Sequence, residues 1–245
     1  MNKTTDSESG NMASRGFFIT GTDTGVGKTL IATALINLLV EQGNKVAGMK
    51  PVSCGCLQVD GQWQHDDAQL MMAASNIKLP YEVINPYAFE PAIAPHLAAL
   101  QVGETISISL VHEKFRILSD VADKIVIEGA GGWLVPINNK ESMADLAVAL
   151  GLPVILVVGL RLGCLNHALL TTQSILEKGG ELAGWVANSI DPLFKHQKDN
   201  INTLKTRIPA PCLGVIPFRD QLGEDHDNRL TQISDISRML IVDQA

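Results

Sequence analysis

The sequence predicts a single α/β domain in which a mainly parallel sheet carries helices on both faces. Two observations lead to this fold class. Short apolar runs typical of buried strands alternate along the chain with segments of helical periodicity. Several runs are rich in β-branched residues, which indicates strands buried on both faces. The 245-residue chain shows neither an internal repeat nor a low-complexity linker, so we expect one domain over residues 16–245.

Charge and hydropathy narrow the classes of function. The net charge of -7 argues against a broad nucleic-acid-binding surface. The longest apolar run, Pro153–Leu160, is too short to span a bilayer. Residues 1–15 are polar and lack the apolar region of a secretory signal. We therefore expect a disordered tail over residues 1–15 and a cytoplasmic protein that binds neither nucleic acid nor membrane.

The first predicted strand and helix enclose a glycine-rich turn. Phe17–Ile19 is predicted to be a buried strand, and the turn GTDTGVGKT runs from Gly21 to Thr29. Apolar residues then follow at the spacing of one helix face: Ile31, Ala34, Leu35, Leu38 and Leu39. A turn between a strand and a helix points backbone N–H groups and the positive helix end at an anion. The sequence thus predicts a phosphate-binding loop and a P-loop NTPase-like fold.

The residue types in the loop support this prediction. Lys28 can place a charge on the β and γ phosphates, and the Thr29 hydroxyl suits Mg²⁺. The spacing departs from the usual G-x-x-x-x-G-K-[ST], because five residues separate Gly21 from Gly27 and Thr22 takes the usual first-glycine position. The alternative is an ordinary glycine-rich turn before a helix.

Two further segments bring a lysine and an aspartate toward this loop. Lys45–Val52 is predicted to be a strand, and Lys50 near its end is either a ligand-binding or a solvated surface lysine. Leu57–His65 is expected to be a loop before the next helix. We interpret Asp66 as the cap of that helix and Asp67 as a candidate Mg²⁺ ligand.

The segment Asn85–His96 holds three prolines in twelve residues. This density excludes a regular helix or a central strand and favours a shaped loop with backbone groups free to meet a ligand. His96 is either a base or a capping or structural histidine. Ile106–Leu118 has helical periodicity.

A second strong signal is the strand Lys124–Glu128, which ends in an acid followed by glycines. An acid at such a strand end commonly completes the Mg²⁺ shell in phosphate-loop proteins. The alternative is a chance acid. Gly131 and Gly132, which follow it, can approach a ligand closely.

The rest of the chain completes the α/β pattern. Predicted strands are Pro153–Gly159, Leu182–Asn188 and Cys212–Phe218, with a helix over Ala168–Lys178 and a closing helix around residues 233–240. Asn188 is either a reader of a base edge or a turn residue. Cys54 and Cys56 lack the second Cys/His pair that a structural metal site requires.

These motifs together resemble those of the dethiobiotin synthetase family over about residues 17–224. Besides the loop, the resemblance rests on Lys50–Val52, Asp67–Ala68, Asn85–His96, Glu128–Gly132, Gly163–Ala168 and Gly184–Asn188. Each motif alone is widespread, but the ordered set is specific.

The resemblance implies an ATP- and Mg²⁺-dependent cyclo-ligase of biotin biosynthesis, with ATP as cosubstrate. In the family, 7,8-diaminopelargonate and CO₂, drawn from bicarbonate, give a carbamate. Its oxygen takes the γ-phosphoryl group, and the second amine attacks the resulting carbamic-phosphoric anhydride to give dethiobiotin. The family is a homodimer whose substrate site borrows residues from the neighbour.

The resemblance also implies site residues. Catalytic residues would be Thr24, Lys28 and Lys50, and metal ligands Thr29, Asp67 and Glu128. ATP-binding residues would be Gly25, Val26, Gly27, Lys28, Thr29, Leu30, Asp67, Glu128, Gly129, Ala130, Gly131, Asn188, Ser189, Pro217, Phe218, Arg219 and Glu224. Substrate-binding residues would be Cys54, Gly163, Cys164, Leu165 and Asn166.

The chain departs from the family pattern at two positions. Cys54 stands where the family commonly has a substrate-binding serine, and Gly25 stands where many members have glutamate. A thiol is a weaker hydrogen-bond donor than a hydroxyl, so a substrate contact through the Cys54 side chain would be weaker than one through serine.

Two other classes compete with this reading. A MinD/ParA-like ATPase switch carries an extra lysine early in the loop, where this chain has Asp23, and the chain has no basic or amphipathic membrane tail. An amide ligase of cobyrinate synthesis carries a glutaminase domain, for which 245 residues leave no room.

Overall fold

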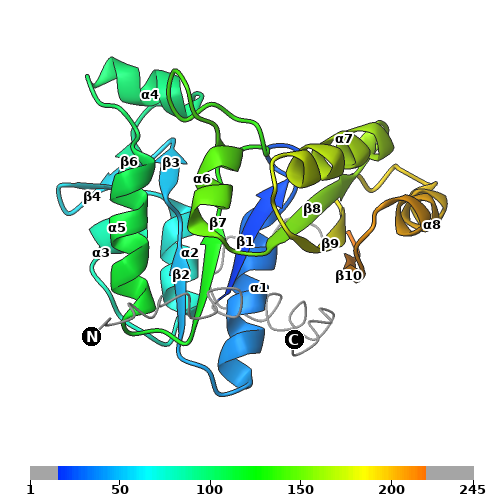
Figure 1. Cartoon of the computed structure of the whole chain (residues 1–245), viewed down its shortest axis with the longest axis horizontal. Coiled ribbons are helices and arrows are strands. Elements are labelled where there is room, and N and C mark those ends of the chain that lie inside the picture. The colour runs from blue at the N-terminus through cyan, green and yellow to red at the C-terminus, as the bar shows by residue number, and fades with distance from the viewer. Residues whose placement is uncertain (1–15, 219–245) are drawn as a thin grey trace, which may run out of the picture.

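The computed structural model describes residues 16–218, and a six-stranded sheet forms the centre of this part of the chain (Figure 1). All of its strand pairs are parallel, in the order β10-β9-β8-β1-β7-β2. Its strands are β1 (Gly16–Gly21), β2 (Val46–Met49), β7 (Lys124–Glu128), β8 (Val154–Leu160), β9 (Leu182–Ser189) and β10 (Cys212–Ile216). The predicted mainly parallel α/β domain is therefore confirmed.

Alternate residues of the central strands enter two separate cores. On β7, Ile125 and Ile127 belong to one core and Val126 to the other. Phe18 and Ile19 of β1 divide in the same way. Burial on both faces explains why these strands appear in the sequence as unbroken apolar runs.

Helices cover both faces of the sheet (Figure 1). α1 (Lys28–Glu41) and α2 (Asp66–Ala74) pack on the Val126 face. On the other face lie α5 (Ile108–Ser119), α6 (Met143–Leu150) and α7 (Cys164–Glu177), with α8 (Gln197–Arg207) packed against α7. Neither α6 nor α8 was predicted from the sequence.

Beyond β2 the chain builds a small second layer of short elements. β3 (Val52–Cys54) pairs in parallel with β6 (Tyr87–Phe89), and two short helices, α3 (Tyr81–Ile84) and α4 (Pro95–Gln101), flank this pair. The predicted loop over Asn85–His96 is therefore wrong in part. It holds a strand outside the central sheet, and Pro95 begins a helix, a position where its missing N–H costs nothing.

The predicted loop over Leu57–His65 is a hairpin of β4 (Leu57–Val59) and β5 (Gln62–Gln64). Asp60 and Gly61 connect the strands with positive φ angles of 51° and 80°. These angles suit a two-residue hairpin turn, for which Asp-Gly is a favoured sequence. The prediction failed because it weighed the polarity of the segment and not this dipeptide.

The predicted strand over Lys45–Val52 is split in two. β2 ends at Met49, and Lys50 lies between β2 and β3. The tail over residues 1–15 and the closing helix around residues 233–240 lie outside the described residues.

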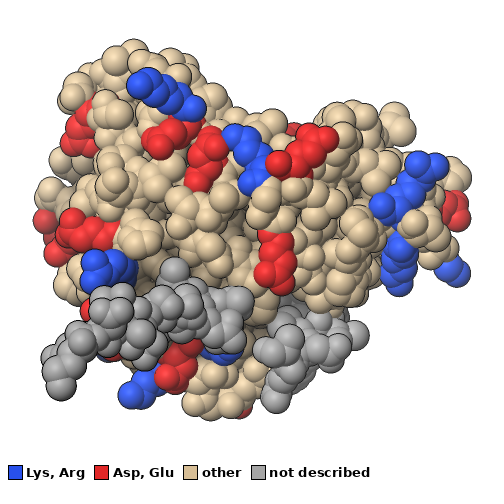
Figure 2. Space-filling view, viewed as in Figure 1, with Lys and Arg blue, Asp and Glu red and all other residues tan. Residues whose placement is uncertain are grey.

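On the face shown in Figure 2, small groups of acidic and basic side chains are scattered among uncharged ones, and basic ones gather at α8, whose last turn holds Lys205 and Arg207. No described helix combines the length and apolarity needed to cross a membrane.

Candidate active site

A cavity of about 720 Å³ opens where β1, β2 and β7 end. Both the phosphate loop and the second layer contribute to its walls. The predicted site residues that line it are Thr24, Gly25, Gly27, Lys28, Thr29, Lys50, Cys54, Asp67, Glu128, Ala130 and Gly131. The parallel sheet thus brings together side chains that lie far apart in the sequence, as the strand-end rule predicts.

The phosphate loop joins β1 to α1 and contains two glycines at positions where any other residue type would be strained. Gly25 and Gly27 have φ angles of 73° and 93°, in the left-handed region. A Cβ on Gly27 would lie 2.3 Å from Asn188 Nδ2. Asn188 Nδ2 donates to the carbonyl oxygen of Val26 at 2.8 Å. The end of β9 therefore holds the loop in place, and the interpretation of Asn188 as a turn residue is wrong.

Lys28 folds back onto its own loop. Its Nζ donates to the carbonyl oxygen of Asp23 at 3.0 Å, and the residue is only 6% exposed. Burial, with a smaller contribution from the Lys50 charge, lowers the pKa of Lys28 to about 8. The Asp23 carboxylate accepts from the Thr24 N–H and pairs with Arg161, which precedes α7. The first residues of α7 are thereby tied to the loop.

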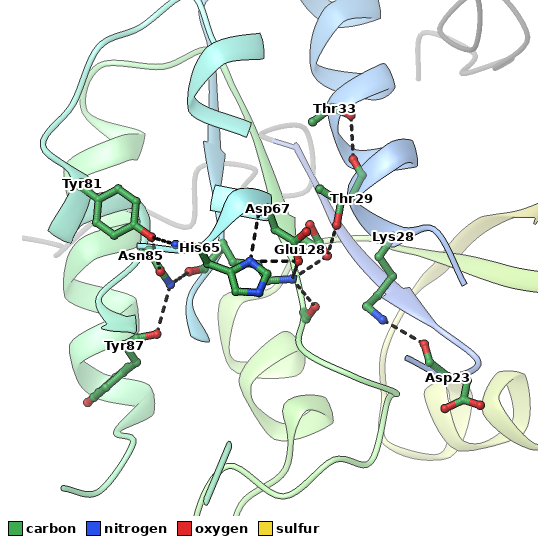
Figure 3. Close-up of polar contacts among 12 residues, drawn as sticks. Asp23, Lys28, Thr29, Thr33, His65, Asp67, Tyr81, Asn85, Tyr87 and Glu128 are labelled. Atoms are coloured by element: carbon green, nitrogen blue, oxygen red, sulfur yellow. Dashed lines mark hydrogen bonds and ion pairs between the residues drawn. The ribbon is translucent and has the colours of Figure 1, made fainter. Parts of the chain in front are cut away.

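Lys50 lies in a buried cluster with two carboxylates, so it is not a solvated surface lysine. Its Nζ is 2.6 Å from Glu128 Oε1 and 3.0 Å from Asp67 Oδ2. Thr29 Oγ1 donates to the same Glu128 oxygen at 3.0 Å. Figure 3 shows Thr29, Asp67 and Glu128 pointing toward one another. Burial would lower the pKa of Lys50, but the charges of Glu128 and Asp67 outweigh it and raise the pKa.

The same cluster fits a magnesium ion. Glu128 is 1% exposed, and its Oε2 is buried without a hydrogen-bond partner among the described residues. The described residues hold no group of three or more His, Cys, Asp or Glu side chains that suits a metal. Two carboxylates and a hydroxyl suit Mg²⁺, because this ion keeps waters and takes phosphate oxygens as ligands.

The backbone of Lys50 is fixed by a chain of polar contacts from α2. The His65 N–H donates to Tyr81 Oη at 2.9 Å, and Tyr81 donates to Asn85 Oδ1 at 2.8 Å. Asn85 Nδ2 then donates to the Lys50 carbonyl oxygen at 2.6 Å (Figure 3). Burial raises the pKa of Tyr81 to about 12, so the phenol keeps the proton that it donates.

His65 is a cavity residue that sequence reasoning missed. Its Nδ1 accepts from the Asp67 N–H at 3.1 Å, so His65 and not Asp66 caps α2. The interpretation of Asp66 as the cap is wrong because the helix begins at Asp66 itself. The sequence signal that could have identified it is a polar residue directly before two acidic residues, because acidic side chains are common in the first turn of a helix.

The two neighbouring cysteines differ in position. Cys54 lines the cavity and Cys56 is 2% exposed. Burial raises the pKa of each thiol to about 11, so both remain protonated near neutral pH.

Other predicted residues lie away from the cavity lining. Gly163 and Asn166 are exposed at the start of α7, where the Cys164 side chain is buried and its Sγ is 3.8 Å from Asn200 Oδ1. Ser189 donates to Gln197 Oε1 at 2.6 Å. The further residues outside the lining are Val26, Leu30, Gly129, Leu165, Asn188, Pro217 and Phe218. Arg219 and Glu224 lie outside the described residues.

His96 also lies outside the cavity lining. It belongs to the first turn of α4, and its Nδ1 is buried without a partner among the described residues. Its place outside the lining gives no support to a base at this cavity, and no hydrogen bond within the described part of the chain shows it as a cap.

Comparisons with known proteins agree with this geometry. A family model described as an AAA domain matches residues 15–226. An ATP-dependent dethiobiotin synthetase from Pseudomonas paraeruginosa is 49% identical over 82% of this chain and 89% of its own length. A second one, from Nitrosospira multiformis, is 46% identical over 92% of this chain and 96% of its own length.

Solved structures of similar fold are more distant. The MinC:MinD cell division complex of Aquifex aeolicus has a TM-score of 0.56 at 17% identity, over 91% of this chain and 94% of the other. A ParA family ATPase of Chlorobium tepidum has a TM-score of 0.55 at 15% identity, over 93% of this chain and 100% of the other. At these identities the likeness shows the fold alone. By its sequence relatives, the chain belongs to the ATP-dependent dethiobiotin synthetase family.

Proposed function

We propose that this protein uses ATP to carboxylate 7,8-diaminopelargonate with CO₂ and to close the product to dethiobiotin, in biotin biosynthesis. One observation carries the proposal. In a chain 49% identical to a dethiobiotin synthetase, two buried lysines and two carboxylates converge on one cavity beside the phosphate loop. This arrangement suits phosphoryl transfer, which depends on positioning and charge stabilisation and needs no covalent enzyme intermediate.

The proposed reaction has three balanced steps. One substrate amine attacks CO₂ and loses a proton, which gives a carbamate. A carbamate oxygen attacks the γ-phosphorus of ATP, and the bond to ADP breaks. The second amine attacks the carbonyl carbon of this anhydride, loses a proton and expels phosphate, which closes the ureido ring.

The phosphate loop is proposed to hold the nucleotide. The N–H groups of Gly25 to Leu30 would cradle the phosphates at the start of α1, with Lys28 leaving the Asp23 carbonyl for a phosphate oxygen. Thr24, at the mouth of the loop, would donate its hydroxyl to the transferring group. Gly129 to Gly131 would border the nucleotide on the β7 side.

Lys50 is proposed to stabilise the charge that develops between the carbamate and the γ-phosphate. It lies at the junction of the phosphate loop and the second layer, where the two reactants would meet. Thr29, Asp67 and Glu128 would hold Mg²⁺, which when bound neutralises phosphate charge. The adenine would lie beyond the loop, near Asn188, Ser189 and residues 217–219, with Glu224.

The substrate would occupy the cavity end lined by Cys54. We further propose that the protein is a homodimer in which Gly163 to Asn166 of one subunit contact substrate bound to the other. Leu162, next to this segment, is 89% exposed and does not line the cavity of its own chain. Leu170, on α7 itself, is 58% exposed, and two exposed leucines on one segment suit a subunit interface.

The test of the reaction is ADP release from ATP and bicarbonate, measured with and without the diamine. We expect release that depends on the diamine and equals the dethiobiotin formed. Hydrolysis that is indifferent to the diamine would refute the proposal and favour an ATPase switch.

The dimer is tested separately by mixing two inactive variants, Lys28→Ala and Asn166→Ala. If each site takes Lys28 from one subunit and Asn166 from the other, a mixed dimer contains one intact site and activity returns. A mixture as inactive as its components, with subunit exchange confirmed by native mass spectrometry, would refute the shared site.

A further inference from the structure

The Lys50 ammonium occupies the position between the two carboxylates proposed as metal ligands. It lies 2.6 Å from Glu128 Oε1 and 3.0 Å from Asp67 Oδ2, and it is 4% exposed. Its third contact, to the Gly129 carbonyl oxygen at 3.4 Å, is longer. The lysine therefore acts as the counter-ion of this carboxylate pair.

A divalent cation on the same oxygens would conflict with this arrangement. Mg²⁺ binds oxygen at about 2.0–2.1 Å and requires close to octahedral surroundings. An ammonium bonded to Glu128 Oε1 and Asp67 Oδ2 takes up the space between the two carboxylates that the ion needs, although Glu128 Oε2 keeps its lone pairs. The two positive charges also repel each other strongly away from water.

We propose that the Lys50 ammonium and a divalent cation exclude each other at Asp67 and Glu128. The cation binds there only after Lys50 has turned to another anionic partner, which the phosphates of a bound nucleotide supply. Free Mg²⁺ is consequently not held by the protein alone, and the metal site forms together with the nucleotide site. The inference rests on the metal and nucleotide sites proposed above.

The surroundings of Lys50 allow its side chain to move while its backbone stays fixed. The Lys50 N–H donates to the Ile84 carbonyl oxygen at 2.9 Å, and its carbonyl oxygen is bonded to Asn85. The side chain has a flexible four-carbon stem with a compact charge at its end. It lines the same cavity as the phosphate loop, so the stem can redirect the charge without refolding.

Lys28 provides an internal control for this inference. It is a second buried lysine in the same cavity, but it donates to the neutral carbonyl oxygen of Asp23. Removing its charge lowers the positive potential at the cluster without freeing a carboxylate. A purely electrostatic effect would therefore be of similar size at both lysines, whereas direct competition adds a further gain at Lys50.

The experiment is a titration of the full chain with Mn²⁺ in the absence of nucleotide, followed by the electron paramagnetic resonance signal of free Mn²⁺. We expect Lys50→Gln to bind Mn²⁺ at least about tenfold more tightly than the wild type, since the competing charge is gone. Lys28→Gln should show a clearly smaller gain. Adding Glu128→Gln to Lys50→Gln should abolish the gain, which locates the ion.

A glutamine at position 50 can still donate a hydrogen bond to Glu128, which protects the fold of that variant. Lys50→Met lacks this bond and provides a second readout. If the proposal holds, Mn²⁺ alone should raise the unfolding temperature of Lys50→Met more than that of the wild type, because the ion replaces the lost counter-ion.

The proposal is overturned if Lys50→Gln binds Mn²⁺ no more tightly than the wild type. An equal gain in Lys28→Gln, or no extra thermal shift in Lys50→Met, would overturn it as well. The result is separable from the proposed reaction, because diamine-dependent ADP release by the wild type is measured independently and neither outcome determines the other.

Discussion

The two sides of the cavity are built in different ways. The phosphate-loop side rests on β1, β7 and α1, whose core residues are buried on both faces of the central sheet. The opposite side rests on β3, β6 and α4, each seven residues or shorter, and its lining includes the exposed Ile93. One side is therefore fixed by the fold, while the other depends on single side chains in short segments.

Because of this difference, we expect substitutions on the two sides of the cavity to have effects of different size. A lysine or a glycine on the phosphate-loop side is held by elements buried in the central sheet, so replacing it should lower turnover or stability. A residue on the opposite side should mainly tune substrate affinity.

The largest effect is expected from removing a buried lysine. Lys28→Ala or Lys50→Ala should lower turnover by roughly a hundredfold or more, because one preorganised donor to developing charge is worth about 3 kcal/mol. The measurement is steady-state ADP release, with circular dichroism to show that the variants remain folded. Lys140→Ala, which removes an exposed lysine, is the matched control. Near-normal turnover in either buried variant would contradict its assigned role.

The sequence predicts those site residues that belong to a local motif or to the end of a parallel strand. Lys28, Thr29 and Glu128 were found because a glycine-rich turn and a strand-end acid are local patterns with a known geometric meaning. The placement of Lys50 and Glu128, which are 78 residues apart, at one cavity agrees with the rule that parallel strand ends share one edge, but their direct ion pair was not predicted.

Three further features were not predicted, for different reasons: helix α8, helix α6 and the hydrogen bond from Asn188. α8 buries mainly Ile201 and Leu204, too few apolar residues for a visible helical period. α6 carried a recognisable start, because Ser142 and Asp145 form a capping box. The bond from Asn188 to Val26 could not be predicted, since it requires the packing of β9 against the loop.

A substitution in the loop should separate backbone strain from contact with Asn188. Gly25→Ala introduces a Cβ with no atom within 4 Å, so only the left-handed φ matters, at a cost of about 1–3 kcal/mol. Gly27→Ala adds the clash with Asn188 and should lose more stability and more nucleotide affinity. Thermal unfolding and titration with a nonhydrolysable ATP analogue measure the two costs.

The double variant Gly27→Ala/Asn188→Ala is the control for that clash. It should recover part of the loss, because the added Cβ then has room, although the bond to Val26 is gone. If Gly25→Ala and Gly27→Ala cost the same, contact with Asn188 does not constrain the loop.

A smaller effect is expected when ATP affinity is measured at different pH values. The pKa of Lys28 in the free protein is about 8, below the usual value because of burial. Bound phosphate favours the charged lysine, so binding above this pKa requires uptake of a proton. As far as Lys28 sets it, ATP affinity should therefore level off below pH 8 and fall above it, by up to about tenfold per pH unit. Lys50 should not contribute, because its pKa is raised and it stays charged in this range.

The pH prediction is tested by calorimetric titration with the ATP analogue across this range, in two buffers of different ionisation enthalpy. Proton uptake should appear above pH 8 in the wild type. In Lys28→Arg the affinity should vary less with pH, because a guanidinium stays protonated. The same pH slope in both proteins would assign the titration to another group.

The smallest effect is expected on the opposite side of the cavity, at Cys54. A hydroxyl is a better hydrogen-bond donor than the protonated thiol present there, and one such bond is worth about 0.5–1.5 kcal/mol. Cys54→Ser should therefore lower KM for the diamine a few-fold and leave KM for ATP unchanged. Cys56→Ser, at a buried position outside the cavity lining, should leave both constants unchanged. An unchanged or raised KM for the diamine in Cys54→Ser would show that the thiol makes no polar substrate contact, and that shape alone defines this side of the cavity.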